Sequence, residues 1–91
     1  MMEEETVLQQ LEAILKELSI ALRYEKGRFQ GGLCRLHGEE VFILNSKLSV
    51  DRKIRIIAKE LSLLNLENVY ILPAIREIIE EMQDESDLVT A

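Results

Sequence analysis

The sequence lacks tryptophan and has only one proline, one cysteine, one histidine and four glycines in 91 residues. So few turn-forming residues argue against a loop-rich scaffold and against an all-β sandwich. A single cysteine cannot close an intramolecular disulfide, which excludes a disulfide-stapled secreted domain and makes a cytoplasmic location the expectation. No apolar run is long enough to cross a bilayer, and the acidic start of the chain is the reverse of a signal peptide, so no membrane partner is expected.

The composition itself is that of a globular protein, with 47% hydrophobic and 31% charged residues. A chain of this length builds one modest core. We therefore expect a single domain over residues 1–83 and an acidic flexible tail over residues 84–91. The net charge of −6 argues against general binding of nucleic acid or of anionic membranes.

The charge is distributed unevenly along the chain. Residues 1–21 carry five acids and one base, residues 22–56 eight bases and four acids, and residues 57–91 two bases and eight acids. One interpretation is that the basic middle segment faces the acidic flanking helices within the fold. The other is an anion-binding surface on an otherwise acidic protein, with candidate contacts at Arg28, Arg35, Arg52, Arg55 and Lys59.

Hydrophobic spacing predicts an α+β fold. Apolar residues recur at helical intervals over 4–22, which predicts a long amphipathic N-terminal helix. Short strand-like runs at 23–25, 29–36 and 41–45, separated by turns, predict a three-stranded antiparallel meander. Ser49 is a good N-cap for a helix that reaches about Leu64, and Pro73 suits the first position of a last helix. We expect the N-terminal helix and the two C-terminal helices to pack mainly on one face of the sheet.

Two features indicate apolar surface that needs a partner. In the third predicted strand, Val41 and Ile43 lie on one face and Phe42 and Leu44 on the other, so both faces need cover, from a helix of this chain or from a partner. On the second helix, Ile56 and Leu63 fall among the bases of the outer side, opposite the core positions. The candidate interface residues are therefore Ile56, Leu63, Phe42 and Leu44.

Catalytic and metal-binding chemistry finds little support. Cys34 and His37 are the only residues of their kinds, and their odd spacing directs their side chains to opposite faces of a strand. A zinc site needs three or four ligands, and no other cysteine or histidine exists to supply them. We interpret Cys34 as a small buried hydrophobe and His37 as a turn residue, and we expect no enzymatic activity, no cofactor and no metal.

The segment from Gly27 to Gly32 is rich in glycine and basic, but it lacks the end of a phosphate-binding loop and does not open a helix. A turn followed by a bulge or a close backbone approach accounts for it. Tyr24 and Phe29, beside Arg28 and Arg35, would offer a stacking platform for single-stranded nucleic acid.

Residues 41–64 resemble the core of ImmA/IrrE-type zinc metallopeptidases. The shared features are a glycine-containing strand, then Val-Phe-Ile-Leu-Asn, a short spacer and a helix with Ile-Ile-Ala-Lys-Glu-Leu. In that family the helix carries His-Glu-x-x-His, which here falls on Lys59, Glu60 and Leu63, so only the glutamate is kept. The resemblance covers about a third of the chain and implies a related strand–helix scaffold without zinc catalysis.

The sequence therefore favours a non-catalytic protein that acts by protein–protein association, with a second copy of itself or another protein as the partner. The alternative is a regulator that binds nucleic acid or another anion through the five bases named above. Salt dependence distinguishes the two, because binding to phosphates weakens steeply as salt rises.

Overall fold

The computed structural model describes residues 2–90 of the chain, with side chains to residue 83. Three helices and three strands follow one another as α1 (Glu4–Glu17), β1 (Ala21–Glu25), β2 (Gly31–Leu36), β3 (Glu39–Asn45), α2 (Val50–Leu61) and α3 (Pro73–Thr90). The α+β class predicted from the sequence is confirmed. Among these helices α3 is the longest, whereas the sequence predicts the longest helix at the N-terminus.

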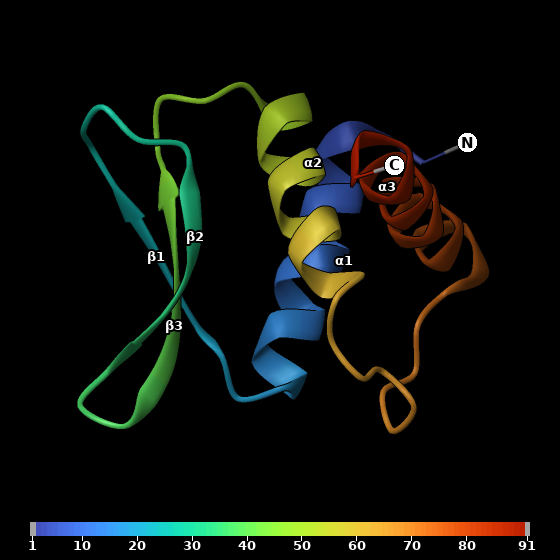
Figure 1. Cartoon of the computed structure of the whole chain (residues 1–91), viewed down its shortest axis with the longest axis horizontal. Coiled ribbons are helices and arrows are strands. Elements are labelled where there is room, and N and C mark those ends of the chain that lie inside the picture. The colour runs from blue at the N-terminus through green and yellow to red at the C-terminus, as the bar shows by residue number, and fades with distance from the viewer. Residues whose placement is uncertain (1, 91) are drawn as a thin grey trace.

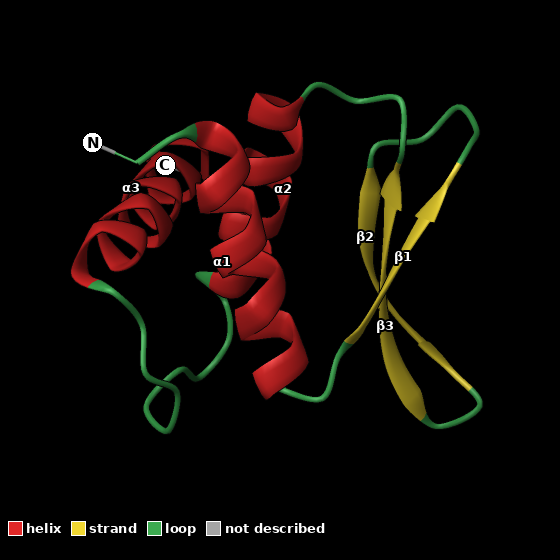
Figure 2. Ribbon diagram, turned by 180° about the vertical axis from the view of Figure 1, so that it is seen from behind, coloured by secondary structure: helices red, strands yellow, loops and turns green. Residues whose placement is uncertain are grey.

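The elements form layers, with the sheet on one side of the molecule and all three described helices on the other (Figure 1). The view from behind shows the same separation (Figure 2). Helices α1 and α2 pack against the sheet and against each other, and α3 packs on α1 and α2. The expectation that the helices cover mainly one face of the sheet is confirmed.

The predicted antiparallel meander is wrong, because the sheet is mixed. The strand order is β1-β3-β2, with β1 parallel to β3 and β2 antiparallel to it. Strand β3 takes the central position because it is the one strand that is apolar on both faces, whereas β1 and β2 carry polar residues and lie at the edges. The connection over residues 26–30 therefore passes across the end of β3 instead of forming a hairpin.

The side chain of Asn45, at the end of β3, holds the 26–30 connection in place by hydrogen bonds. Its side-chain Nδ2 donates hydrogen bonds to the carbonyl oxygens of Gly27 at 2.9 Å and Phe29 at 2.7 Å. Its Oδ1 accepts a hydrogen bond from the Lys47 N–H at 3.0 Å. The Asn45 side chain is thus a buried polar group whose donors and acceptor all have partners, as burial requires.

Gly31 explains the glycine-rich start of β2. Its φ is +150°, and a Cβ there would lie 2.6 Å from the carbonyl oxygen of Ile43. Only glycine fits this close approach of two backbones, as the sequence suggests for this segment. The β2–β3 hairpin is closed by His37 and Gly38, whose φ angles of 52° and 82° suit a two-residue turn.

Helix boundaries differ from the predicted ones at three ends. Helix α1 ends at Glu17 rather than residue 22, because Ser19 adopts a left-handed conformation with φ of 61° and the chain then enters β1. Helix α2 ends at Leu61 rather than residue 64. The backbone of α3 continues to Thr90, through most of the predicted tail over residues 84–91, while Ala91 lies outside the described residues.

The core lies between the sheet and the helices. Its largest fully buried side chains are Phe42, Leu11, Leu15, Leu44, Ile57, Leu61 and Ile75. Within the described residues, no helix combines the length and the hydrophobicity that a membrane crossing requires.

Candidate interaction surfaces

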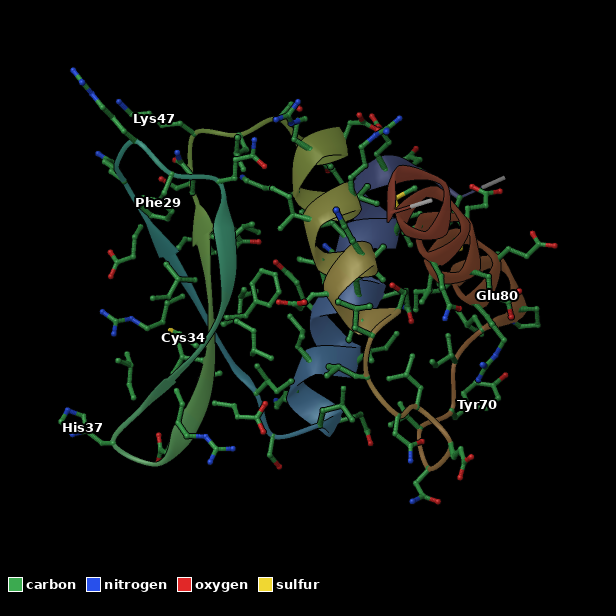
Figure 3. All side chains as sticks on the ribbon, viewed as in Figure 1. Phe29, Cys34, His37, Lys47, Tyr70 and Glu80 are labelled. Carbon is green, nitrogen blue, oxygen red and sulfur yellow. The ribbon has the colours of Figure 1, made fainter. Side chains whose placement is uncertain are left out.

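The sheet face that points away from the helices is not covered by any helix of residues 2–90 (Figure 1). Strand alternation places the side chains of Val41, Ile43, Cys34 and Leu36 on this face. Cys34 and Phe29 point away from the helices (Figure 3). We call these five residues the outer sheet face. The same alternation places Arg23 and Glu25 of β1 and Glu39 of β3 on this side, so charged residues border the apolar ones.

On the outer sheet face, side chains at the centre are more buried than side chains at the ends. Val41 is only 5% exposed although no helix covers it, because the side chains of the flanking strands surround it, whereas Phe29 is 39% and Leu36 40% exposed. At one end the face is hollowed into an open groove of about 420 Å³. Gly32 leaves this space free, since a Cβ there would meet no atom within 4 Å. The groove is lined by Phe29, Gln30, Gly31, Gly32, Leu33, Cys34 and Ile43.

Phe42 and Leu44, two of the four predicted interface residues, face the helices instead. Both are 0% exposed and belong to the core cluster. They need no partner, because α1 and α2 cover their side of β3. The correction is that the strand's other face, with Val41 and Ile43, carries the unpartnered apolar surface.

The other two predicted interface residues lie on α2 and just after it, and they differ in exposure. Ile56 is half-buried and packs against the edge of the core, whereas Leu63, just beyond the helix, is 66% exposed. Ile56 also lines a shallow groove of about 200 Å³ between the start of β2, α2 and α3. We call it the edge groove; its lining residues are Gln30, Arg52, Arg55, Ile56, Lys59 and Met82.

The edge groove brings together three of the five predicted anion contacts, Arg52, Arg55 and Lys59. Arg55 is paired with Asp51 at 3.2 Å. Neither Arg52 nor Lys59 has an ion-pair partner among the side chains of residues 2–83.

The remaining two predicted anion contacts do not line that groove. Arg28 is on the 26–30 connection. Arg35 is on β2, where its side chain lies 3.7 Å from the Glu40 carboxylate. The structure therefore does not gather the five bases into one surface.

The predicted aromatic stacking platform is not assembled, because Tyr24 and Phe29 lie on opposite sides of the sheet. The Tyr24 hydroxyl donates a hydrogen bond to the Glu12 carboxylate of α1, and the Lys53 Nζ lies 5.1 Å from the centre of its ring. Partial burial and the hydrogen bond to Glu12 raise the pKa of Tyr24 well above its usual value. Tyr24 thus joins β1 to the two helices.

Cys34 and His37 are in different settings. Cys34 is half-buried on the outer sheet face, and His37 is exposed in the β2–β3 turn (Figure 3). In the part of the chain that the structure describes, no three histidine, cysteine or acidic side chains are grouped in a way that could hold a metal ion.

The residues aligned with the ImmA/IrrE motif lie along the end of α2. Lys59 is exposed, and Glu60 accepts a hydrogen bond from the Leu33 N–H of β2 at 3.3 Å. Comparison of the chain with family models, curated proteins and solved structures gave no match. The resemblance therefore stays a prediction.

Sequence reasoning did not identify Phe29, Cys34 and Leu36 as parts of one apolar surface. The available signal was the alternation in β2, where Gly32, Cys34 and Leu36 share a face. That signal alone does not tell which face the helices cover. Phe29 precedes the strand, so its placement depends on the hydrogen bonds of Asn45.

Proposed function

We propose that the protein acts by protein–protein association through the outer sheet face, and that the first partner to consider is a second copy of the chain. The supporting observation is a central strand that is apolar on both faces in a fold whose described helices cover only one of them. Contiguous exposed apolar surface on a small protein is typical of an interaction site.

The charges that border the outer sheet face affect its pairing with a second copy. The charged residues of β1 on the same side of the sheet, Arg23 and Glu25, form an ion pair of 2.8 Å, so these two charges balance each other. When two such faces meet, each copy adds the unbalanced charge of Glu39 at the start of β3. Like charges weaken such a contact where they lie directly opposite each other.

The size of the face limits the strength of the association. Three strands of about six residues cover roughly 20 Å by 14 Å, or about 300 Å² of projected area per copy. Stable interfaces bury about 1,600 Å² in total, or about 800 Å² per copy, so this face alone supports a weak complex with a dissociation constant on the order of 10⁻⁵ to 10⁻⁴ M. Such a dimer forms at high concentration and separates on dilution.

Sedimentation or light scattering over a concentration series from about 10 µM to about 1 mM tests the proposal, with the range set by the expected affinity. The double variant Phe29→Ser/Leu36→Ser should stay monomeric throughout, because it removes the two most exposed side chains of the face. Tyr70→Ser, at an 83% exposed position on the far side of the molecule, should leave the native behaviour unchanged (Figure 3).

Two results would count against this assignment. A native protein that remains monomeric at the highest concentration has no self-association to explain. A dimer that survives Phe29→Ser/Leu36→Ser but separates in Leu63→Glu would place the interface at the end of α2 instead. High salt should leave the dimer intact, since apolar contacts respond little to ionic screening.

A further inference from the structure

The free edge of β2 offers backbone hydrogen-bonding groups beside the basic side of α2. In an antiparallel pair, alternate residues bond the neighbouring strand and the others point outward. The Asn45 N–H donates to the Gln30 carbonyl at 3.0 Å, and in this register Gly32, Cys34 and Leu36 also bond β3. The N–H and C=O groups of the three intervening residues, Gly31, Leu33 and Arg35, therefore point away from the sheet.

One of these edge groups already has a partner, which confirms their direction. The Leu33 N–H donates to the Glu60 Oε1 of α2 at 3.3 Å, a long hydrogen bond. Within the described part of the chain, no other hydrogen bond engages this edge. Strand β2 and helix α2 lie side by side, and the edge groove, which Ile56 lines, begins where β2 starts.

From this geometry we propose that the edge groove binds an extended acidic segment of a partner protein, which adds to β2 as a fourth strand. The backbone of the segment would bond the outward groups of Gly31, Leu33 and Arg35. Its acidic side chains would meet the bases Arg52 and Lys59, which lack ion-pair partners among residues 2–83. Strand addition of this kind takes affinity from the backbone and specificity from alternate side chains.

The spacing of the groove residues defines a pattern for the ligand. Along α2, Ile56 lies between Arg52 and Lys59, which are about 10 Å apart at 1.5 Å per residue. Alternate side chains of a strand are about 6.6 Å apart on one face. An acid, an apolar residue and a second acid at alternate positions would therefore place the apolar side chain on Ile56 and the two carboxylates near the bases.

Charge and chemistry favour this occupant over two others. A second copy paired edge to edge would bring the bases of both α2 helices together, which costs free energy. A nucleic acid would gain nothing from the alternating donors and acceptors of a strand edge, and the net charge of −6 would repel it. The proposed binding of an acidic segment involves a surface other than the outer sheet face. It does not depend on dimer formation through that face.

The test uses a labelled peptide, Thr-Glu-Thr-Val-Thr-Glu-Thr, and the full chain at low salt. Fluorescence anisotropy should show binding, and the backbone amide signals of Gly31, Leu33 and Arg35 should shift in the NMR spectrum. The lysine version, Thr-Lys-Thr-Val-Thr-Lys-Thr, should not bind. A version N-methylated on alternate amides keeps every charge but cannot complete the ladder, so it should not bind either.

Variants supply the second half of the test. Arg52→Glu/Lys59→Glu should weaken binding by about tenfold or more, because two attractive charges become repulsive. Lys16→Glu, a reversal at an exposed base on α1, should change it by less than about twofold. Glu60→Ala should strengthen binding several-fold, since it frees the Leu33 N–H and removes a like charge.

Several results would overturn the proposal. They are no binding at millimolar peptide, equal binding of the N-methylated peptide, or an affinity that the double reversal leaves unchanged. Tighter binding of an oligothymidylate than of the peptide, lost in the same double reversal, would instead assign the groove to nucleic acid. The monomer–dimer measurement on Phe29→Ser/Leu36→Ser does not depend on peptide binding. Failure of the dimer proposal and failure of the peptide proposal can therefore be told apart.

Discussion

Replacing Asn45 by alanine should destabilise the protein far more than the loss of an ordinary surface amide. The side chain is 8% exposed and makes three hydrogen bonds, to the carbonyls of Gly27 and Phe29 and from the Lys47 N–H. Each buried hydrogen bond contributes about 1 kcal/mol net, so the free energy of unfolding should fall by about 3 kcal/mol. A chain of 91 residues has a total of roughly 5–14 kcal/mol, which makes this a large fraction.

Urea denaturation followed by circular dichroism measures the change directly, and the corresponding fall in Tm is roughly 12–24 °C. Asn65→Ala is the matched control, because the Asn65 Oδ1 accepts one exposed hydrogen bond from the Glu67 N–H. That variant should lose less than about 1 kcal/mol. If Asn45→Ala loses no more than Asn65→Ala, then water replaces the side chain and Asn45 does not fasten the connection across β3.

Further perturbations test other parts of the fold. Gly31→Ala should destabilise by at least about 1–3 kcal/mol in chemical denaturation, because its φ of +150° and the close backbone leave no room for a Cβ. The neighbouring Gly32→Ala should cost less than about 1 kcal/mol, and equal losses for the two would contradict the geometry. The raised pKa of Tyr24 means that the folded state holds this proton more tightly, so its contribution to stability is complete below the unfolded pKa of about 10 and is lost as pH rises. Tyr24→Phe should therefore flatten the decline in Tm above about pH 10, and an unchanged decline would show that another group causes it.

The helices were predicted well because helical spacing and capping depend on residues that are close together in the sequence. In α2, spacing alone placed six residues on the core side. Ile54, Ile57, Ala58 and Leu61 are buried, and Val50 and Leu64 are half-buried against the core. The N-cap prediction is confirmed in detail, since the Ser49 Oγ accepts a hydrogen bond from the Arg52 N–H at 3.2 Å. The end of α1 was missed because a serine in the left-handed conformation has no signal as strong as that of glycine.

The order of the strands was not predictable from the same patterns. Neighbouring strands in sequence usually pair, which favours a meander, but here the pairing of β1 with β3 depends on contacts far apart in the chain. The sequence did contain a relevant signal, because a strand that is apolar on both faces belongs in the middle of a sheet. Choosing between the two orders also required the hydrogen bonds of Asn45 to Gly27 and Phe29, which no local pattern reveals.

The candidate surfaces, like the fold, were predicted from the sequence only in part. The outer side of α2 followed from helical geometry, so Ile56, Arg52 and Lys59 were identified, and the structure adds that they share one groove. The outer sheet face was only half predicted. The need for a covered second face was inferred from β3, but the residues chosen for the interface, Phe42 and Leu44, were those on the side that the helices cover.

The free edge of β2 also bears on solubility, because an open strand edge is a template for unwanted pairing with other chains. Natural proteins block such edges, and here Glu60 partly does so by bonding the Leu33 N–H and placing a carboxylate beside the strand. A covalent block such as a proline would close the edge permanently, whereas a side chain held by a 3.3 Å hydrogen bond can move aside. Under the proposal above, a segment that forms several backbone hydrogen bonds and opposite-charge contacts would displace Glu60, whereas one that forms a single hydrogen bond would not. The proposed addition of a segment to β2 therefore requires the Glu60 side chain to move away from the Leu33 N–H.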